Sequence, residues 1–376
     1  MRNETRLRFN AYVSQIALIN NVEDATTKFS VDPVVEQRLE TKMRESSEFL
    51  SMINVTPVID QTEQTLGLGT TRSMAGRTDT SGGARRNPTD PTGSAETNTY
   101  FCRKTDFDWA MAYGLLDAWR HRPEFETLLR DEILKQQARD RIMIGWNGTS
   151  AAATTDRVAN PLLQDVNIGW LKKIRDRAPA QVMNDGALTV RTNGTNNAAL
   201  RAIYVKPGVV LFDPNATSAQ PGHSTTAAAD YSSLDALVLD AKRLLPEWHR
   251  NRTDLVVIVG NDLVDDKYFT IAQTTGATAT EVEATDRILR SNKQIGGLPA
   301  VMVPFFPGNA ILITTLKNLS IYYQEGTRRR YLKDEPEYNR IANYESVNED
   351  YVVEDYDLVA FVENIVIGAA PDRPAP

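Results

Sequence analysis

The distribution of large apolar side chains divides this 376-residue chain into segments, and one long segment has almost none. From residue 70 to residue 98 the only large apolar residue is Met74, whereas residues such as Val58 and Phe107 flank the segment on either side. Structureless stretches of this length are uncommon inside a compact domain. The pattern predicts two strands that run out and return as an extended hairpin over 58–108. An arm cannot bury its own sides and needs a neighbouring molecule, which favours an assembly protein over a self-contained enzyme.

Helical spacing of apolar residues predicts four helices in the first half of the chain. The first covers 3–20, and its early arginines oppose the helix dipole, so it is weak alone and needs a partner. The second begins at Asp32 and Pro33, because proline is favoured in a first helical turn. The third covers 123–146 and is about 35 Å long at 1.5 Å per residue. A shorter helix fits 168–177.

From Ser232 onward the pattern changes to alternating helices and strands. Ser232 and Asp235 form the start signal of a helix. The continuous apolar run 255–259 is typical of a strand that is covered on both faces. Two further predicted strands, 300–303 and 311–314, complete a small α/β unit.

The strands that follow this unit, 319–323 and 351–366, alternate apolar and polar residues and flank a charged hairpin at 328–337. We expect these strands to lie beside the long helix and so to complete a second subdomain. The Gly/Asn/Thr/Ala-rich stretch 181–231 is interpreted as a surface insertion, and 369–376 as a tail. The predicted fold class is therefore α+β.

The composition is that of an ordinary soluble protein, with 41% hydrophobic and 24% charged residues. The net charge of −7 and the pI of about 5.3 argue against a protein that grips nucleic acid, although an acidic shell can still enclose DNA. No apolar run is long enough to span a membrane, and no secretory signal follows Met1. Cys102 is the only cysteine, which excludes an intrachain disulfide and suits a reducing cytosol.

A search for catalytic chemistry finds little. The histidines His121, His223 and His249 are scattered, and none has the spacing of a metal-ligand set. Gly260 follows an apolar strand as in a nucleotide-binding turn, but neither a dinucleotide nor a P-loop fingerprint follows it. The acids from Asp262 onward stand at a helix start, so dipole capping explains them better than a cation site does. We expect no catalytic residue, no cofactor and no metal.

Charged residues instead suggest contacts between copies of the chain. Two arginines occupy the predicted tip of the hairpin, and three form a basic run in the later charged hairpin. Strand alternation over 345–357 places its carboxylates on a solvated or partner-facing edge. The predicted intersubunit residues are Arg85, Arg86, Arg328, Arg329, Arg330, Glu349, Asp350, Glu354 and Asp355.

Six long stretches carry a family resemblance. They are 6–12 (RLRFNAY), 160–180 (NPLLQDVNIGWLKKIRDRAPA), 233–241 (SLDALVLDA), 254–269 (DLVVIVGNDLVDDKYF), 295–323 (IGGLPAVMVPFFPGNAILITTLKNLSIYY) and 343–356 (NYESVNEDYVVEDY). In this order they resemble the major capsid proteins of Peduovirus-type tailed bacteriophages and cover most of the chain. None is a short generic motif, so the resemblance is specific, whereas 181–230 and the residues after Gly368 match poorly.

The resemblance implies the capsid fold that tailed phages share with herpesviruses. The implied parts are an N-terminal arm (30–57), an extended loop (58–108), a peripheral domain with a long spine helix (109–180 and 317–368) and an α/β axial domain (232–316). It also implies a function, which is self-assembly through pentamers and hexamers into the icosahedral head that encloses double-stranded DNA. The implied location is the virion, with assembly in the host cytoplasm.

The resemblance further implies partners. These are a scaffolding protein, a maturation protease and a portal protein, and a decoration protein is a further candidate. The protease would remove an N-terminal assembly segment, 1–29, at a bond near Phe29 and Ser30.

Two alternatives stay open on the sequence. A small enzyme with a nucleotide-binding α/β domain at 232–316 would bind nucleotide saturably as a monomer. A binding module whose arm swaps between two protomers would form a stable dimer and nothing larger.

Overall fold

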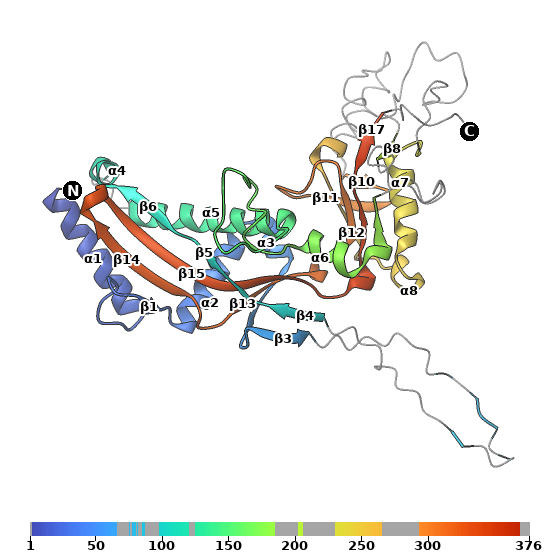
Figure 1. Cartoon of the computed structure of the whole chain (residues 1–376), viewed down its shortest axis with the longest axis horizontal. Coiled ribbons are helices and arrows are strands. Elements are labelled where there is room, and N and C mark those ends of the chain that lie inside the picture. Colours follow the sequence, from blue (N-terminus) through green and yellow to red (C-terminus); the bar gives the residue numbers. More distant parts are fainter. Residues whose placement is uncertain are drawn as a thin grey trace, which may run out of the picture.

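The computed structural model describes residues 2–65, 75, 77–79, 81, 85–86, 98–119, 125–184, 202–205, 230–264 and 293–368. The described part is elongated, with α1 at one end, a small sheet with its helices at the other, and the paired strands 62–65 and 98–101 at its lower edge (Figure 1). The α-helices are α1 (Asn3–Ile19), α2 (Pro33–Glu45), α3 (Glu48–Met52), α4 (Tyr113–Trp119), α5 (Phe125–Asn147), α6 (Trp170–Arg177), α7 (Leu234–Ala241) and α8 (Glu247–Arg250).

The strands belong to two large sheets and two strand pairs. The strands are β1 (Phe29–Ser30), β2 (Asn54–Val58), β3 (Thr62–Thr65), β4 (Asn98–Phe101), β5 (Arg103–Asp106), β6 (Trp109–Ala112), β7 (Val182–Met183), β8 (Ile203–Val205), β9 (Val256–Val259), β10 (Gln294–Ile295), β11 (Leu298–Met302), β12 (Ile311–Thr314), β13 (Leu319–Gln324), β14 (Arg329–Glu335), β15 (Arg340–Val353), β16 (Ala360–Val362) and β17 (Ile365–Ile367).

The N-terminal helices form where the sequence predicts them. Asp32 caps α2, because its side chain accepts a hydrogen bond from the N–H of Val34 at 2.9 Å, and Pro33 opens the helix. α2 and α3 bury apolar residues such as Met43 and Leu50 in the main core. α1 packs against a smaller cluster that includes Leu332 of β14. The N-arm is therefore part of the body rather than a free tether.

The peripheral sheet is built around its longest strand, β15. Strands β13 and β14 follow one another along one edge of β15 and pair with 349–353 and 340–346 respectively, both antiparallel. Strands β5 and β6 pair with its other edge. A bulge at 325–328 separates β13 from β14, and Gly326 in it has a φ of +73°, a conformation that favours glycine. This bulge positions one of the charged residues described below.

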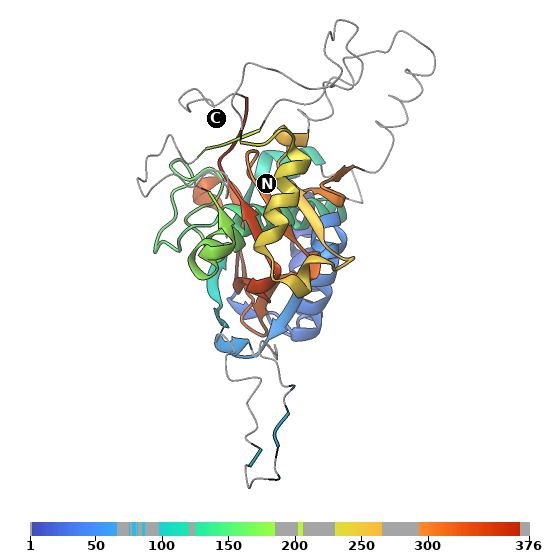
Figure 2. The same ribbon diagram turned by 90° about the vertical axis from the view of Figure 1, so that its right-hand side faces the viewer.

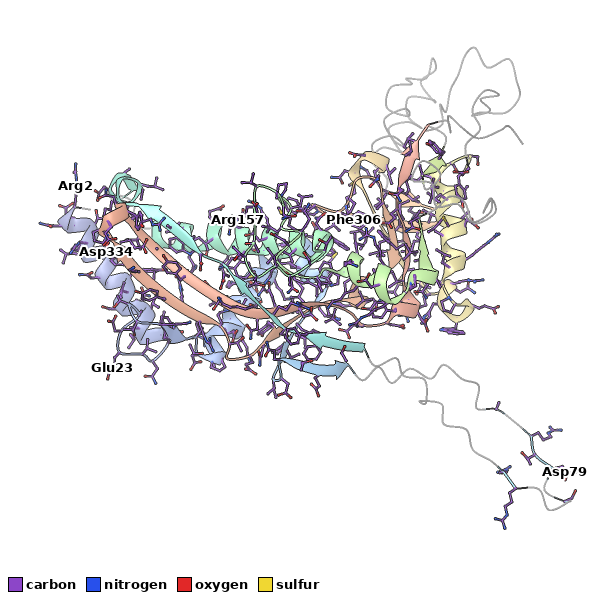
Figure 3. All side chains as sticks on the ribbon, viewed as in Figure 1. Arg2, Glu23, Asp79, Arg157, Phe306 and Asp334 are labelled. Carbon is purple, nitrogen blue, oxygen red and sulfur yellow. The ribbon has the colours of Figure 1, made fainter. Side chains whose placement is uncertain are left out.

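The long helix α5 runs beside this sheet, as expected of a spine (Figure 1). Its C-terminal end packs into an aromatic core where α3, α6 and the two domains meet. Phe306, at this junction in Figure 3, lies with its ring centroid 5.0 Å from that of Trp146. The other ring contacts join Trp146 to Phe49 and Trp170, and Trp170 to Phe49 and Tyr351.

The axial sheet has the strand order β10-β11-β9-β12-β16-β7. β9 runs parallel to β11 and antiparallel to β12, and residues 257–259 are fully buried, as the apolar run predicts. α7 packs against this sheet at the end of the molecule opposite α1 (Figures 1 and 2). Its stripe, which includes Leu237 and Val238, is buried as expected.

Several predicted boundaries differ from the structure; the predicted strand 351–366, for example, is divided among the end of β15, β16 and β17. The cap of α7 is Ser233 rather than Ser232, and Asp235 accepts the N–H of Gly296 at 2.7 Å instead of closing a capping box. β16 pairs with β12 of the axial sheet, so the span 317–368 is not wholly peripheral. The alternating pattern alone could not assign these short strands, because both sheets bury apolar residues.

The base of the predicted extended hairpin is formed by β3 and β4. They pair antiparallel from Thr62 opposite Phe101 to Thr65 opposite Asn98. Asp79 lies far beyond the free end of this pair and away from the body (Figure 3). Most of 66–97 lies outside the described residues, as do most of the insertion 181–231 and the tail 369–376.

Candidate functional site

The turn after β9, where the sequence suggested nucleotide binding, is closed by the chain itself. Gly260 donates its N–H to the carbonyl of Ala310 at 3.1 Å. A Cβ on Gly260 would lie 2.2 Å from the carbonyl oxygen of Gly308. The close approach of two backbones therefore requires this glycine, and its N–H is already used.

Within the part of the chain that the structure describes, no group of three or more His, Cys, Asp or Glu side chains is placed to hold a metal ion. His249 lies with its Nε2 3.7 Å from Oδ2 of Asp355. His121 and His223, and the acids that follow Asp262 at 265 and 266, lie outside the described residues.

A buried charge network joins α2, α5 and β15. At its centre, Arg141 of α5 is only 1% exposed and donates through both terminal nitrogens to Glu40 of α2, at 2.5 and 3.0 Å. The Nε of Arg141 donates to Glu349 of β15 at 2.9 Å. The hydroxyl of Tyr351 also donates to Glu349, at 3.2 Å. The helix of the N-arm is thus tied to the spine and to the central strand.

Arg328 brings the bulge between β13 and β14 into the same network. It is 1% exposed and donates to Glu345 at 2.6 Å and, through its other terminal nitrogen, to Glu40. Its Nε lies 3.7 Å from Glu36, and Glu36 accepts the N–H of Gly326 at 3.0 Å. The buried charge network therefore consists of Glu36, Glu40, Arg141, Arg328, Glu345 and Glu349.

Carboxylates outnumber guanidinium groups in this network by four to two. Burial raises the pKa of Glu36 and of Glu349, because each loses hydration that its cations do not fully replace. Burial also acts on Glu40, but Arg141 and Arg328 together lower its pKa. The folded chain therefore holds protons on Glu36 and Glu349 more tightly than the unfolded chain does.

The expectation that the acidic strand presents its carboxylates on an open edge is wrong. β15 is paired on both edges, and Glu349 and Asp350 are 0% and 2% exposed. The partners of Arg328, Glu349 and Asp350 belong to the same chain. Alternation fails as a guide here because helices cover one face of the strand and the base of the hairpin covers part of the other.

The other predicted contact residues have mixed surroundings. Arg329 is exposed, whereas Arg330 is half-buried and donates to Asn343 at 2.7 Å. Glu354 accepts hydrogen bonds from Tyr322 at 2.9 and 3.0 Å and from a serine of β13. Asp355 caps a short 3-10 turn.

The remaining predicted residues lie at the arm and at the tip. Phe29 and Ser30 form β1, which pairs with Arg330 and Arg329 at the edge of the peripheral sheet. Phe29 is buried, whereas Ser30 is exposed. The tip arginines, Arg85 and Arg86, are exposed.

Sequence reasoning missed Glu36, Glu40, Arg141 and Lys173. A signal was present in the helical spacing, because Glu36 and Glu40 stand one turn apart on the α2 side that faces the core. Arg141 lies between Ala138 and Ile142 on the buried side of the spine. A charged residue at a buried helical position predicts a partner, but it does not say whether that partner belongs to the same chain.

The architecture now defines a class of protein. A spine helix beside a long sheet, an axial α/β domain, an N-terminal arm and a projecting hairpin form the fold of tailed-phage capsid proteins. The structure is similar to that of a chain in the satellite phage P4 procapsid that includes the size determination (Sid) protein, with a TM-score of 0.75, 42% identity and coverage of 98% of this chain and 100% of that one.

The sequence comparisons identify the family. The family model for the phage major capsid protein, P2 family, matches residues 8–365, and the chain belongs to this family. It is 43% identical to the capsid protein of Escherichia phage P2, over 98% of this chain and 96% of the relative. It is 40% identical to the major capsid protein of Serratia phage KSP20, over 99% of both chains.

Membership decides between the classes that the sequence left open. The chain is a structural building block of a phage capsid, it self-associates in that role, and it is not an enzyme. The reading of Gly260 as part of a nucleotide-binding domain is therefore rejected. Among the described residues, no helix combines the length and apolar character needed to cross a membrane.

Proposed function

We propose that this chain assembles through pentamers and hexamers into an icosahedral head that encloses double-stranded DNA. In this assembly the extended hairpin lies over the next subunit of the same ring. The observation that carries the proposal is the β3–β4 hairpin, which leaves the body and has exposed arginines, Arg85 and Arg86, in the segment beyond it. Repeated contacts of this kind make a closed shell cooperative even where each contact is weak.

The hairpin contact has an electrostatic part. The carboxylates of 345–350 have partners within the chain, so the tip arginines need another acidic surface on the neighbour. Arg329 is exposed at the edge of the sheet and is a further candidate for a contact between subunits.

The first test is electron microscopy of the purified chain, expressed with and without a scaffolding partner. Closed shells or ring-shaped capsomers support the proposal, whereas a uniform monomer or dimer in both preparations contradicts it.

The tip is tested by replacing Arg85 and Arg86 with alanine. Arg77→Glu on the same arm is the matched control, because it changes the net charge by the same amount. Equal assembly of the tip variant and the unmodified chain would rule out docking through the tip arginines.

We also propose that a scaffolding protein directs assembly, that a maturation protease cuts near Phe29 and Ser30, and that a portal protein occupies one vertex of the head. β1 has only two residues and lies at a sheet edge, so a protease can gain access by displacing one short strand. Mass spectrometry of the chain, expressed alone and with its protease, tests this. A mature N-terminus far from residue 30 would contradict the assignment.

A further inference from the structure

A second buried charge pair, separate from the buried charge network, holds the base of the extended hairpin. Asp350 of β15 accepts from the ammonium group of Lys173 of α6 at 2.7 and 2.8 Å. The same carboxylate accepts the backbone N–H of Phe101, the last residue of β4, at 3.1 Å. One side chain thus joins the central strand, a helix and the hairpin.

Helix α6 contacts the hairpin directly one turn further on. Arg177 donates to the backbone carbonyl of Thr99 in β4 at 3.0 Å. Lys173 and Arg177 are four residues apart, so they lie on the same side of the helix. This side of α6 therefore contacts both the carboxylate that holds β4 and β4 itself.

Apolar packing closes the base around this pair. Tyr100 packs edge-on against Tyr322 with ring centroids 5.1 Å apart, and both lie in a small cluster with Val352 and Cys102. Cys102 is 0% exposed, and its N–H donates to the carbonyl of Gln61 at 2.8 Å. This cluster is separate from the main core, so the base of the hairpin can open without unfolding the body.

Because the pair lies at the base of the hairpin, a small change of angle there moves the far end of the hairpin by a large distance. If 66–97 were fully extended, half of it would reach up to about 50 Å, at roughly 3.3 Å per residue. A tilt of about 10° at the base would then move the far end by up to about 9 Å. An arm that must meet a particular surface on a neighbour needs a fixed angle of departure.

We propose that Asp350 and Lys173 are positioning residues that set the angle at which the hairpin leaves the body. This inference rests on the proposed function, in which the hairpin lies on the next subunit. Asp350 lies inside the chain, so it acts on the contact between subunits through β4 and not by touching the neighbour.

The reactivity of Cys102 reports whether the base of the hairpin is open or closed. It is the only cysteine in the chain, and burial raises the pKa of its thiol to about 12, so it is protected while the base is closed. We would measure the rate at which a maleimide reagent labels Cys102 in the unassembled chain. The test variants are Asp350→Asn, Lys173→Met and the double variant, which leaves no uncompensated buried charge.

The matched controls are Lys172→Met and Asp176→Asn, which remove an exposed ion pair of 2.5 Å on the same helix. We expect labelling at least tenfold faster in all three test variants and unchanged labelling in the controls. Tryptophan fluorescence shows whether the body remains folded, and the double variant keeps the test valid if a single variant unfolds. Unchanged labelling in a folded double variant would overturn the inference.

Assembly of the same proteins separates this inference from the proposed function. Faster labelling together with shells of altered size or open sheets supports the positioning role. Faster labelling together with normal closed shells would show that the pair holds the base but does not position the arm, which overturns the proposal. If the unmodified chain forms no shell under any condition, the proposed function fails. The labelling rate then still shows whether Asp350 and Lys173 hold the base of the hairpin closed.

Discussion

Glu40→Gln should cost much more stability than Glu349→Gln, although both carboxylates contact the guanidinium group of Arg141. Glu40 accepts two hydrogen bonds from Arg141 and one from Arg328. A glutamine there would remove the negative charge that Arg141 and Arg328 share and would turn its amide NH₂ group toward at least one guanidinium donor. Breaking a buried ion pair in this way costs about 3–5 kcal/mol.

Glu349→Gln changes much less. Burial raises the pKa of Glu349, so ionising this carboxyl already costs free energy in the folded chain. A glutamine can still accept from the Nε of Arg141 and can donate to the hydroxyl of Tyr351. We expect a loss of about 1 kcal/mol or less.

The assay is urea unfolding of the unassembled chain, followed by tryptophan fluorescence. Trp170 is a suitable reporter, because its ring centroid lies 5.4 Å from that of Tyr351. The Glu40 variant should shift the midpoint down by about 1–2 M, and the Glu349 variant by less than about 0.5 M. Glu45→Gln on the exposed side of α2 is the control and should have almost no effect. Equal shifts for Glu40 and Glu349 would refute this account of the network.

Three further predictions concern the buried charge network, two glycines and the junction of the two domains. The pKa values of Glu36 and Glu349 are raised in the folded chain, so the contribution of these two groups to stability should fall as the pH rises above about 4.5, their ordinary value. The urea midpoint of the Glu36→Gln/Glu349→Gln variant should lack this fall. Gly145→Ala should greatly reduce the yield of folded protein, because its Cβ would lie 2.3 Å from the ring of Trp170. Gly114→Ala, whose Cβ would have no neighbouring atom within 4 Å, should be neutral or stabilise the protein by about 0.5–1 kcal/mol in thermal melts. Asn318→Ala should loosen the junction of the two domains at a cost of about 2–4 kcal/mol, because this side chain bonds both the N–H and the carbonyl of Asp355, and hydrogen exchange over 354–359 should rise.

The sequence predicted the elements that depend on local signals. Asp32 with Pro33 fixed the start of α2, and the apolar run 255–259 fixed a buried strand, because capping and periodicity act within a few residues. The sparse stretch after Leu68 predicted a hairpin, of which the structure describes the base, β3 and β4. The sheet membership of β16 depends on pairing with β12, which lies almost fifty residues earlier in the chain, and no local signal specifies it.

The charged residues were the least predictable part. Arg328 and Asp350 are residue types that usually lie at the surface. Here the bulge between β13 and β14 places Arg328 in the interior, and the base of the hairpin covers Asp350. The backbone conformation around Gly326 determines where Arg328 lies, and the contact with Phe101 covers Asp350. The spacing of residues in the sequence predicts neither feature. The prediction that these charges contact other subunits assumed that each acid and arginine faces solvent. Arg329 is exposed, whereas Arg328 is buried.

The placement of the buried charge network bears on how an N-terminal segment could be removed without loss of the fold. Residues before Ser30 are held by a small cluster around Leu332 and by polar contacts such as Thr5 with Asp117 at 2.6 Å and Arg6 with Asp334 at 3.4 Å. The network begins at Glu36, and the main core takes in α2 from Met43 onward. A cut near residue 30 would therefore take away α1 and β1 while α2 stays held to the spine by buried ion pairs. Attachment that is weak before this bond and strong after it is what the proposed removal of residues 1–29 requires.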